Sequence, residues 1–273
     1  MLPIRVINFG GKKYKRNDTA KDVELCHLSE FGIEACNFVE NLSRSLPDCN
    51  SGYLKRYFAW FGEFDEFLYS DNDIVAVSDW SKLFEYLTDH TLVHADKEFA
   101  TNGQFNFKDA PAVEKILGKD VHVQALTAGH FLCRKETKHI DDISAALDWM
   151  IEHANLVKLH DQTLLQVACI MGGWKKINLC RPPYNWGSSW HGDYKNTLDI
   201  LQAIQRGVSI SHIHYSGYTP FGVQPVEELL MSNMGNAPRV RKQFANTARE
   251  ILGVNVMLQV LSRVSRKVKR IWG

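Results

Sequence analysis

Two aspartates, Asp71 and Asp73, are the residues of this 273-residue chain whose type and spacing most directly suggest chemistry. They lie between two short apolar runs, 67–69 and 74–77. Two carboxylates at positions i and i+2 of an extended turn can face one point, and oxygen ligands of this kind hold hard divalent cations such as Mg²⁺ or Mn²⁺. Such a cation keeps room for phosphate oxygens and could neutralise a departing diphosphate. The alternative is an ordinary polar turn, because Asp and Asn are common turn residues.

Two further groups of polar residues have both a chemical and a structural interpretation. His212 and His214 alternate along a predicted strand, where a histidine is commonly a hydrogen-bonded structural residue. No cysteine has the spacing that a soft-metal site with these histidines would need. Asp161 and Gln162 begin a predicted helix, and an aspartate there is stabilised by the helix dipole whether or not it has a further role.

The elements that must position these residues alternate between strands and helices. Apolar runs predict strands at 2–9, 91–95, 125–134, 175–180 and 209–217, and helical spacing predicts helices at 28–45, 51–64, 78–90, 140–154 and 161–173. Alternation of this kind predicts an α/β fold with a mostly parallel central sheet. In such a sheet ligands bind at the carboxyl ends of the strands, and the aspartate pair directly follows one.

The amino-acid composition indicates which broad classes of protein this chain can belong to. The content of hydrophobic residues is 45%, enough for a substantial core, and the net charge of +1 gives no support for a nucleic-acid partner. The cysteines form no CxxC pair and no disulfide framework, so we expect small buried side chains in a reducing compartment. We find no signal peptide and no transmembrane stretch, and we expect a cytoplasmic protein. The six cysteines are Cys26, Cys36, Cys49, Cys133, Cys169 and Cys180.

Five segments, in order, resemble glycosyltransferases of the GT-A type, especially the retaining family-8 group that includes glycogenin and bacterial lipooligosaccharide galactosyltransferases. YLKRYFAWFGEFDEFLYSDNDIVAVSDWSKLFEYL resembles the family's helix, strand, DxD motif and following helix. TLVHAD, LTAGHFL, KLHDQTLLQ and HIHYSGYTPF resemble, in turn, its acidic strand end, its Asn-Ala-Gly strand, its Asp-Gln helix start and its closing His-x-x-Gly motif. The resemblance covers about residues 52–221.

The resemblance implies a Rossmann-like nucleotide-sugar transferase fold and a role for each matching residue. Metal binding would fall to Asp71, Asp73 and His214, with Mn²⁺ or Mg²⁺ as the cofactor. Donor binding would fall to Arg56, Asp96, Ala128, Gly129 and Gly217, and the active centre would contain Asp161 and Gln162. The resemblance implies that the chain is a hexosyltransferase that retains the configuration of the sugar.

Some positions depart from the family pattern. Thr127 replaces the Asn of Asn-Ala-Gly, Gln166 replaces an Asn in the Asp-Gln helix, and Thr219 and Phe221 replace the closing Lys and Trp. Without that Lys, stabilisation of the leaving diphosphate must depend more on the metal or on another cation. The segment before Asp71 is also shorter than the family's nucleotide-binding half, which leaves recognition of the base open.

The aromatic loop 181–194 and the C-terminal segment give two more predictions. We expect the loop residues Trp186, Trp190, His191 and Asp193 to line the acceptor or donor pocket, the alternative being a surface loop.

Residues 255–273 place valines every four positions opposite five cations, which predicts either an amphipathic helix on an anionic membrane or a helix packed on the catalytic domain. The five cations are Arg263, Arg266, Lys267, Lys269 and Arg270.

These observations predict a GT-A catalytic domain at 1–223 and a C-terminal helical extension at 224–273. The predicted function is transfer of a sugar from a nucleoside-diphosphate sugar, UDP-linked by the resemblance, to a polysaccharide or lipid-linked oligosaccharide. The alternatives are a metal-dependent nucleotidyltransferase or phosphohydrolase, and a non-catalytic binding module with a transferase fold. The expected partners are the donor, a glycan or lipid-linked acceptor and, through 255–273, the inner face of the cytoplasmic membrane.

Overall fold

The computed structural model of the protein describes residues 4–7, 23–26, 28–71, 73–101, 105–118, 121 and 124–215. The chain divides into two compact units, each described by itself below. The first comprises Met1–Trp190 with Val208–His214, and the second His191–Gly207 with Tyr215–Gly273. The predicted helical extension at 224–273, with its boundary at 223, lies outside the described residues.

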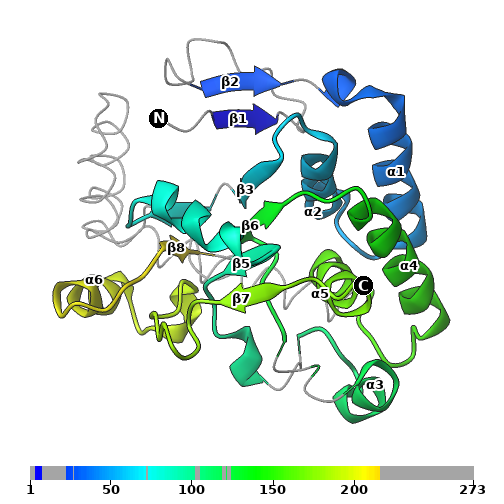
Figure 1. Ribbon diagram of the computed structural model, residues 1–273. Coiled ribbons are helices and arrows are strands. Elements are labelled where there is room, and N and C mark those ends of the chain that lie inside the picture. The colour runs from blue at the N-terminus through cyan, green and yellow to red at the C-terminus, as the bar shows by residue number, and fades with distance from the viewer. Residues whose placement is uncertain are drawn as a thin grey trace, which may run out of the picture. The chain divides into compact units, whose positions relative to one another are not determined.

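A four-stranded sheet in the order β3-β6-β5-β7 forms the centre of the first unit (Figure 1). Its strands are β3 (Glu66–Ser70), β5 (Leu92–His94), β6 (His130–Arg134) and β7 (Lys176–Asn178). β6 pairs antiparallel with both β3 and β5, and β5 pairs parallel with β7. Three strands therefore run in one direction and β6 runs against them, which gives a mixed sheet with one parallel and two antiparallel pairings.

Two smaller sheets complete the strands of this unit. β1 (Ile4–Ile7) pairs parallel with β2 (Val23–Cys26), a strand that the sequence pattern did not predict. β4 (Ile74–Ala76) pairs antiparallel with β8 (His212–His214), with Ile74 opposite His214. This second pairing brings the end of the described chain back to the turn that contains the aspartate pair.

Helices cover both faces of the central sheet. The α-helices of the first unit are α1 (Gly32–Ser45), α2 (Ser51–Leu54), α3 (Ala110–Leu117), α4 (His139–Glu152) and α5 (Asp161–Met171). The 3₁₀ segments are η2 (Leu28–Phe31), η3 (Lys55–Phe61), η4 (Trp80–Thr88) and η5 (Glu98–Thr101). The segments at 55–61 and 80–88 have the helical character predicted for them, in the tighter 3₁₀ form.

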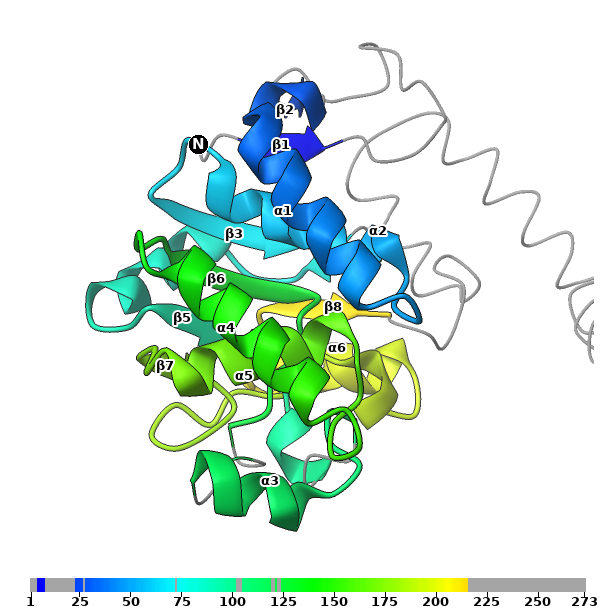
Figure 2. The ribbon, with the colours of Figure 1, turned by 90° about the vertical axis from the view of Figure 1, so that its right-hand side faces the viewer.

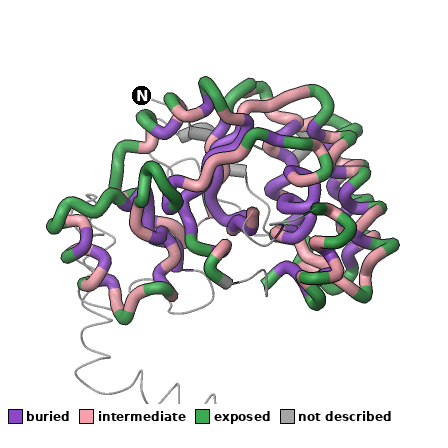
Figure 3. The backbone as a smooth tube through the Cα atoms, turned by 60° about the horizontal axis from the view of Figure 1, so that its bottom comes forward, coloured by how far each residue is buried: buried purple, intermediate pink, exposed green. Residues whose placement is uncertain are grey.

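The alternation of side chains along the strands explains the two layers. On β6, Phe131 and Cys133 pack into the larger core with α1, η3, α4 and α5, whereas Leu132 packs with η4 in a smaller one. Figure 2 shows α1 and α4 side by side over one face of the sheet, and Figure 3 shows that the buried residues gather between these layers. Apolar packing therefore covers both faces of the sheet, and the polar residues of the predicted site lie at the ends of its strands.

The amino end of α4 buries a histidine in the larger core, and this gives a prediction about pH. The His139 ring is fully buried, lies 3.9 Å from the Trp174 ring, and accepts a hydrogen bond from Trp60 Nε1 at 3.3 Å. Burial lowers the pKa of His139 to about 4. Because this folded-state pKa is below the ordinary value of about 6.5, the unfolded chain binds the proton first as pH falls, and stability present above pH 6.5 is lost between about 6.5 and 4.

We therefore expect His139→Gln, which keeps an acceptor for Trp60 but does not titrate, to flatten the dependence of stability on pH. Between pH 7.5 and 5.0 the variant should lose roughly 2 kcal/mol less unfolding free energy than the wild type, measured by urea denaturation. His153→Gln, near the other end of α4, is the control. Parallel losses in the wild type and His139→Gln would contradict the prediction.

The second unit, in its described part, consists of η6 (His191–Asp193), α6 (Thr197–Gln205) and Tyr215. Asn196 caps α6 by accepting a hydrogen bond from the backbone N–H of Asp199 at 3.1 Å. Tyr215 lies with its ring 4.9 Å from that of His191 and its hydroxyl 3.1 Å from that of Thr197. No helix in the described residues of either unit is long and apolar enough to cross a bilayer.

Candidate metal and donor site

One edge of the central sheet collects the polar residues predicted for the site. The carboxyl ends of β3, β5 and β7 and the amino end of β6 lie at this edge. Asp71 directly follows β3, Asp96 follows β5 by two residues, and Gly129 directly precedes β6. The reversed direction of β6 is what allows residues before a strand and residues after its neighbours to meet.

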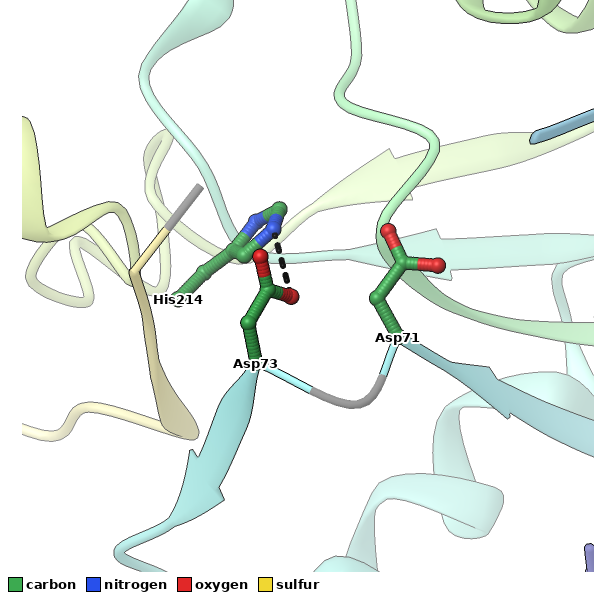
Figure 4. A group of neighbouring side chains, drawn as sticks. All are labelled: Asp71, Asp73 and His214. Carbon is green, nitrogen blue, oxygen red and sulfur yellow. Dashed lines mark ion pairs between the residues drawn. The ribbon is translucent and has the colours of Figure 1, made fainter. Parts of the chain in front are cut away.

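Asp71, Asp73 and His214 form a cluster that could hold a metal ion (Figure 4). One ligand atom from each residue lies within 4.8 Å of the others. His214 Nε2 is 3.5 Å from Asp73 Oδ1, an oxygen that is buried and makes no hydrogen bond within the described part of the chain. Two carboxylate oxygens and one imidazole nitrogen are a ligand set that suits Mn²⁺ and Mg²⁺.

The charges around the cluster also favour a bound cation. Burial raises the pKa of Asp71, against the opposing effects of Arg56, Tyr69 and His214. Asp73 has a lowered pKa because of its interaction with the His214 ring, although burial acts in the other direction. A divalent cation would compensate the buried charge of Asp71 and provide Asp73 Oδ1 with a partner.

Gly129 makes the close approach of these residues possible. Its carbonyl accepts a hydrogen bond from the backbone N–H of Asp71 at 2.8 Å. A Cβ at position 129 would collide with the His214 ring and lie 3.0 Å from Asp71 Oδ2. A residue without a side chain is therefore required next to the cluster, which gives Gly129 a reason that is independent of any bound sugar.

Arg56 joins this cluster to the start of α5. Its side chain is 4% exposed and lies between two carboxylates, 3.6 Å from Asp71 Oδ2 and 3.1 Å from Asp161 Oδ2. It also donates from Nε to the Tyr53 carbonyl at 2.8 Å. The sequence predicted that Arg56 faces the donor, and the structure shows it holding two aspartates of the predicted site.

Asp96 is 1% exposed and is held by its neighbours. Its Oδ2 contacts His94 Nδ1 at 2.7 Å and accepts hydrogen bonds from Thr127 N and Oγ1 at 3.1 and 3.2 Å. Its Oδ1 accepts from the Glu98 N–H at 3.0 Å. Burial alone would raise the pKa of Asp96, but His94 and these donors lower it below its ordinary value. Thr127, a departure from the family pattern, thus fixes Asp96 and leads directly into the buried Ala128.

The residues of the aromatic loop 181–194 lie in different places, and only some of them are near the metal cluster. Trp190 makes a backbone bridge to His214, which places it beside the metal cluster. Trp186 packs instead against the smaller core, with its ring 6.5 Å from that of Tyr86. His191 and Asp193 belong to the second unit, and Gly217 lies outside the described residues.

Two residues of the site were not predicted from the sequence. Tyr69 donates its hydroxyl to Asp71 Oδ1 at 2.5 Å, and its ring lies 5.1 Å below the Arg56 guanidinium. Its position near the end of β3, two residues before Asp71, is a signal that could have found it, because side chains at i and i+2 of an extended segment share a face. Asn106, which contacts Gln162 at 3.1 Å, has no such signal, because a loop brings it there from 56 residues away.

A solved structure and a family model are similar to this chain. The sequence matches no curated protein. The fold is similar to the solved structure titled "WbbM bifunctional glycosytransferase apo structure", with 14% identity, a TM-score of 0.47, and coverage of 83% of this chain but 41% of that one. The chain thus spans less than half the length of this structural relative.

The model of the family described as "Glycosyl transferase family 8" matches residues 12–220, which is more than half of the chain. The mixed α/β architecture, with the Asp-Asp-His cluster formed where β3 ends and β4 pairs with β8, has the features expected of a GT-A fold. The chain therefore belongs to glycosyl transferase family 8.

Proposed function

We propose that this protein transfers a hexosyl group from a nucleoside-diphosphate sugar, UDP-linked, to a polysaccharide or a lipid-linked oligosaccharide, with retention of configuration. The observation that carries the proposal is the Asp71–Asp73–His214 cluster at the loop edge of the sheet in a member of family 8. The nucleotidyltransferase and phosphohydrolase alternatives gain no support from this family, and the non-catalytic alternative does not require the aspartate pair and His214 to converge.

In this proposal Asp71, Asp73 and His214 would hold Mn²⁺ or Mg²⁺. When bound, the cation would neutralise charge on the diphosphate as it departs. Arg56 keeps Asp71 and Asp161 in fixed positions through its two ion pairs, so that the metal site and the start of α5 keep one geometry. Pre-organisation of this kind spares the reaction the cost of ordering charged groups when the transition state forms.

The remaining predicted site residues would orient the donor sugar and the acceptor. Asp96 is 1% exposed and already contacts His94, Thr127 and Glu98, so in this proposal it would act on the donor sugar by holding the backbone at Thr127 in place. Ala128 would let the sugar approach the backbone closely, and Gly129 would contribute by leaving room for the His214 ring and Asp71 of the metal cluster. Trp190, beside His214, would offer an aromatic face to a sugar ring.

Turnover tests this proposal directly. We expect release of UDP from at least one member of a panel of UDP-hexoses, with Mn²⁺ or Mg²⁺ and not with EDTA, and transfer when an oligosaccharide acceptor is added. GDP-, ADP- and TDP-linked sugars are the comparison set. Equal release with and without EDTA, or release of nucleoside monophosphate in place of the diphosphate, would contradict it.

Peripheral attachment to membranes is a separate part of the proposal. It rests on the basic, valine-rich sequence of residues 255–273, which lie outside the described residues. The chain truncated after residue 254 should sediment less with vesicles containing anionic lipid than the full chain does, while keeping its turnover of a soluble donor. Equal sedimentation of the two forms would favour a helix packed on the protein.

A further inference from the structure

A chain of three side-chain amides runs through the interior from a backbone carbonyl to Gln162. Gln166 Nε2 donates to the Val121 carbonyl at 2.8 Å, Asn106 Nδ2 donates to Gln166 Oε1, and Gln162 Nε2 donates to Asn106 Oδ1 at 3.1 Å. Gln162 and Gln166 are one turn apart on α5, and Asn106 comes from the loop before α3. We call these three side chains the amide relay.

The two inner members of the relay are held without freedom to adjust. Asn106 and Gln166 are both fully buried. The backbone carbonyl of Asn106 accepts hydrogen bonds from the Lys158 N–H at 2.9 Å and from Thr163 Oγ1 at 3.3 Å. The loop is thereby fastened to α5 and to the segment before it, and Asn106 can contact Gln162 and Gln166 only from this position.

The relay has a direction, and the backbone sets it. An amide side chain has a donor end and an acceptor end, and rotation by half a turn exchanges them. The Val121 carbonyl can only accept, so Gln166 must point its NH₂ group toward Val121 and its oxygen toward Asn106. Asn106 must then point its NH₂ group toward Gln166 and its oxygen toward Gln162. Reversing any one amide would place two oxygens or two NH₂ groups against each other in a buried site, at the cost of an unmade hydrogen bond.

We infer that Asn106 and Gln166 are positioning residues that fix the orientation of the Gln162 amide, with its NH₂ group turned inward and its carbonyl oxygen available as the atom that acts on substrate. The inference rests on the proposed function, in which Gln162 lies in the active centre next to Asp161. Gln162 is half-buried, so it differs from the inner pair in being accessible. An oxygen carries partial negative charge, which would stabilise the positive charge that develops on the donor sugar when its bond to the diphosphate breaks.

A pair of substitutions at position 106 separates this role from a structural one. Asn106→Asp keeps an acceptor facing Gln162 in either protonation state, and when protonated it also keeps a donor for Gln166. Asn106→Leu is close in size but removes the acceptor. We expect Asn106→Asp to retain kcat within about fivefold, and Asn106→Leu to lose roughly 10- to 100-fold in kcat with the KM for the donor changed less than about threefold. A purely structural role predicts the reverse order, because a buried carboxyl group is harder to accommodate than a buried leucine.

Further variants keep the test decisive if Asn106→Leu does not fold. Gln166→Met removes the link to Val121 and should lower kcat, whereas Gln202→Met, an exposed glutamine on α6, is the matched control and should not. Assays run below the unfolding midpoint of every variant. The inference is overturned if Asn106→Asp and Asn106→Leu lose kcat equally, or if kcat follows the unfolding midpoint across the set.

An NMR readout distinguishes failure of the relay from failure of the proposed function. The side-chain NH₂ signals of Gln162, assigned by their loss in Gln162→Met, should move in Gln166→Met and stay in place in Gln202→Met. Unmoved signals in Gln166→Met would overturn the relay even in an active enzyme. If the relay signals move but the wild type turns over no nucleotide sugar, the proposed function fails and the role of the Gln162 oxygen fails with it.

Discussion

Asp73→Asn is expected to lower the rate of sugar transfer by about two to three orders of magnitude while leaving the fold intact. The substitution removes one of the two carboxylate ligands in the Asp71–Asp73–His214 cluster but keeps the shape of the side chain. Metal stabilisation of charge on the leaving group is worth several kcal/mol, and a loss of about 3–4 kcal/mol corresponds to this change in rate. Steady-state release of UDP at saturating Mn²⁺ measures the effect.

Asp79→Asn is the matched control for this substitution. Asp79 caps η4 by accepting a hydrogen bond from the Ser81 N–H at 3.0 Å, and asparagine is an equally good cap. The control should keep wild-type rates and the same circular dichroism spectrum. A rate for Asp73→Asn within about threefold of the control would contradict a catalytic metal at the Asp71–Asp73–His214 cluster.

Arg56→Met is expected to destabilise the protein by roughly 3–5 kcal/mol, because it leaves two carboxylates without their shared cation. Asp71 and Asp161 have side chains that are only 24% and 10% exposed, so solvent replaces little of the lost interaction. The pKa of Asp71 should rise further, since Arg56 is a main factor that opposes the effect of burial. Urea denaturation at pH 7.5 gives the change in unfolding free energy.

Two comparisons make the Arg56 result specific. Arg44→Met removes an arginine whose ion pair with Glu40, at 3.1 Å, is largely exposed, and it should cost less than about 0.5 kcal/mol. Adding Mn²⁺ should restore part of the stability of Arg56→Met, because the cation would compensate Asp71 in place of the guanidinium. Equal losses for the two arginine variants would show that Arg56 is not the charge partner of the site.

The sequence predicts most of the elements because their local patterns are strong. The apolar runs around Asp71 and Asp73, and the helix that Asp161 begins, follow from periodicity alone. The direction of β6 does not follow, because strand direction depends on pairing with β3 and β5 rather than on local sequence. The same limit explains why β2 was missed, since its partner among the described residues is a strand 19 residues earlier in the chain.

The candidate site shows a similar division between local and tertiary information. The aspartate pair is visible in the sequence, and His214 joins it through the resemblance to family 8. The buried ion pairs of Arg56 and the amide relay depend on contacts between distant segments, which no local pattern encodes. At Trp186 a local pattern was misleading. The aromatic-rich loop suggested a sugar pocket, but the Trp186 ring packs in the smaller core.

The measurement that tests the central claim most directly is the unfolding midpoint of the wild type with UDP and Mn²⁺, with each alone, and with UDP and EDTA. A ligand that binds only the folded state raises the midpoint by mass action, so no acceptor is needed. If the Asp71–Asp73–His214 cluster binds a cation that in turn binds the diphosphate, UDP and Mn²⁺ together should raise the midpoint by more than the sum of their separate shifts, and Asp73→Asn should abolish the excess. An equal shift with UDP in EDTA, or no shift with any nucleotide and metal, would contradict the claim.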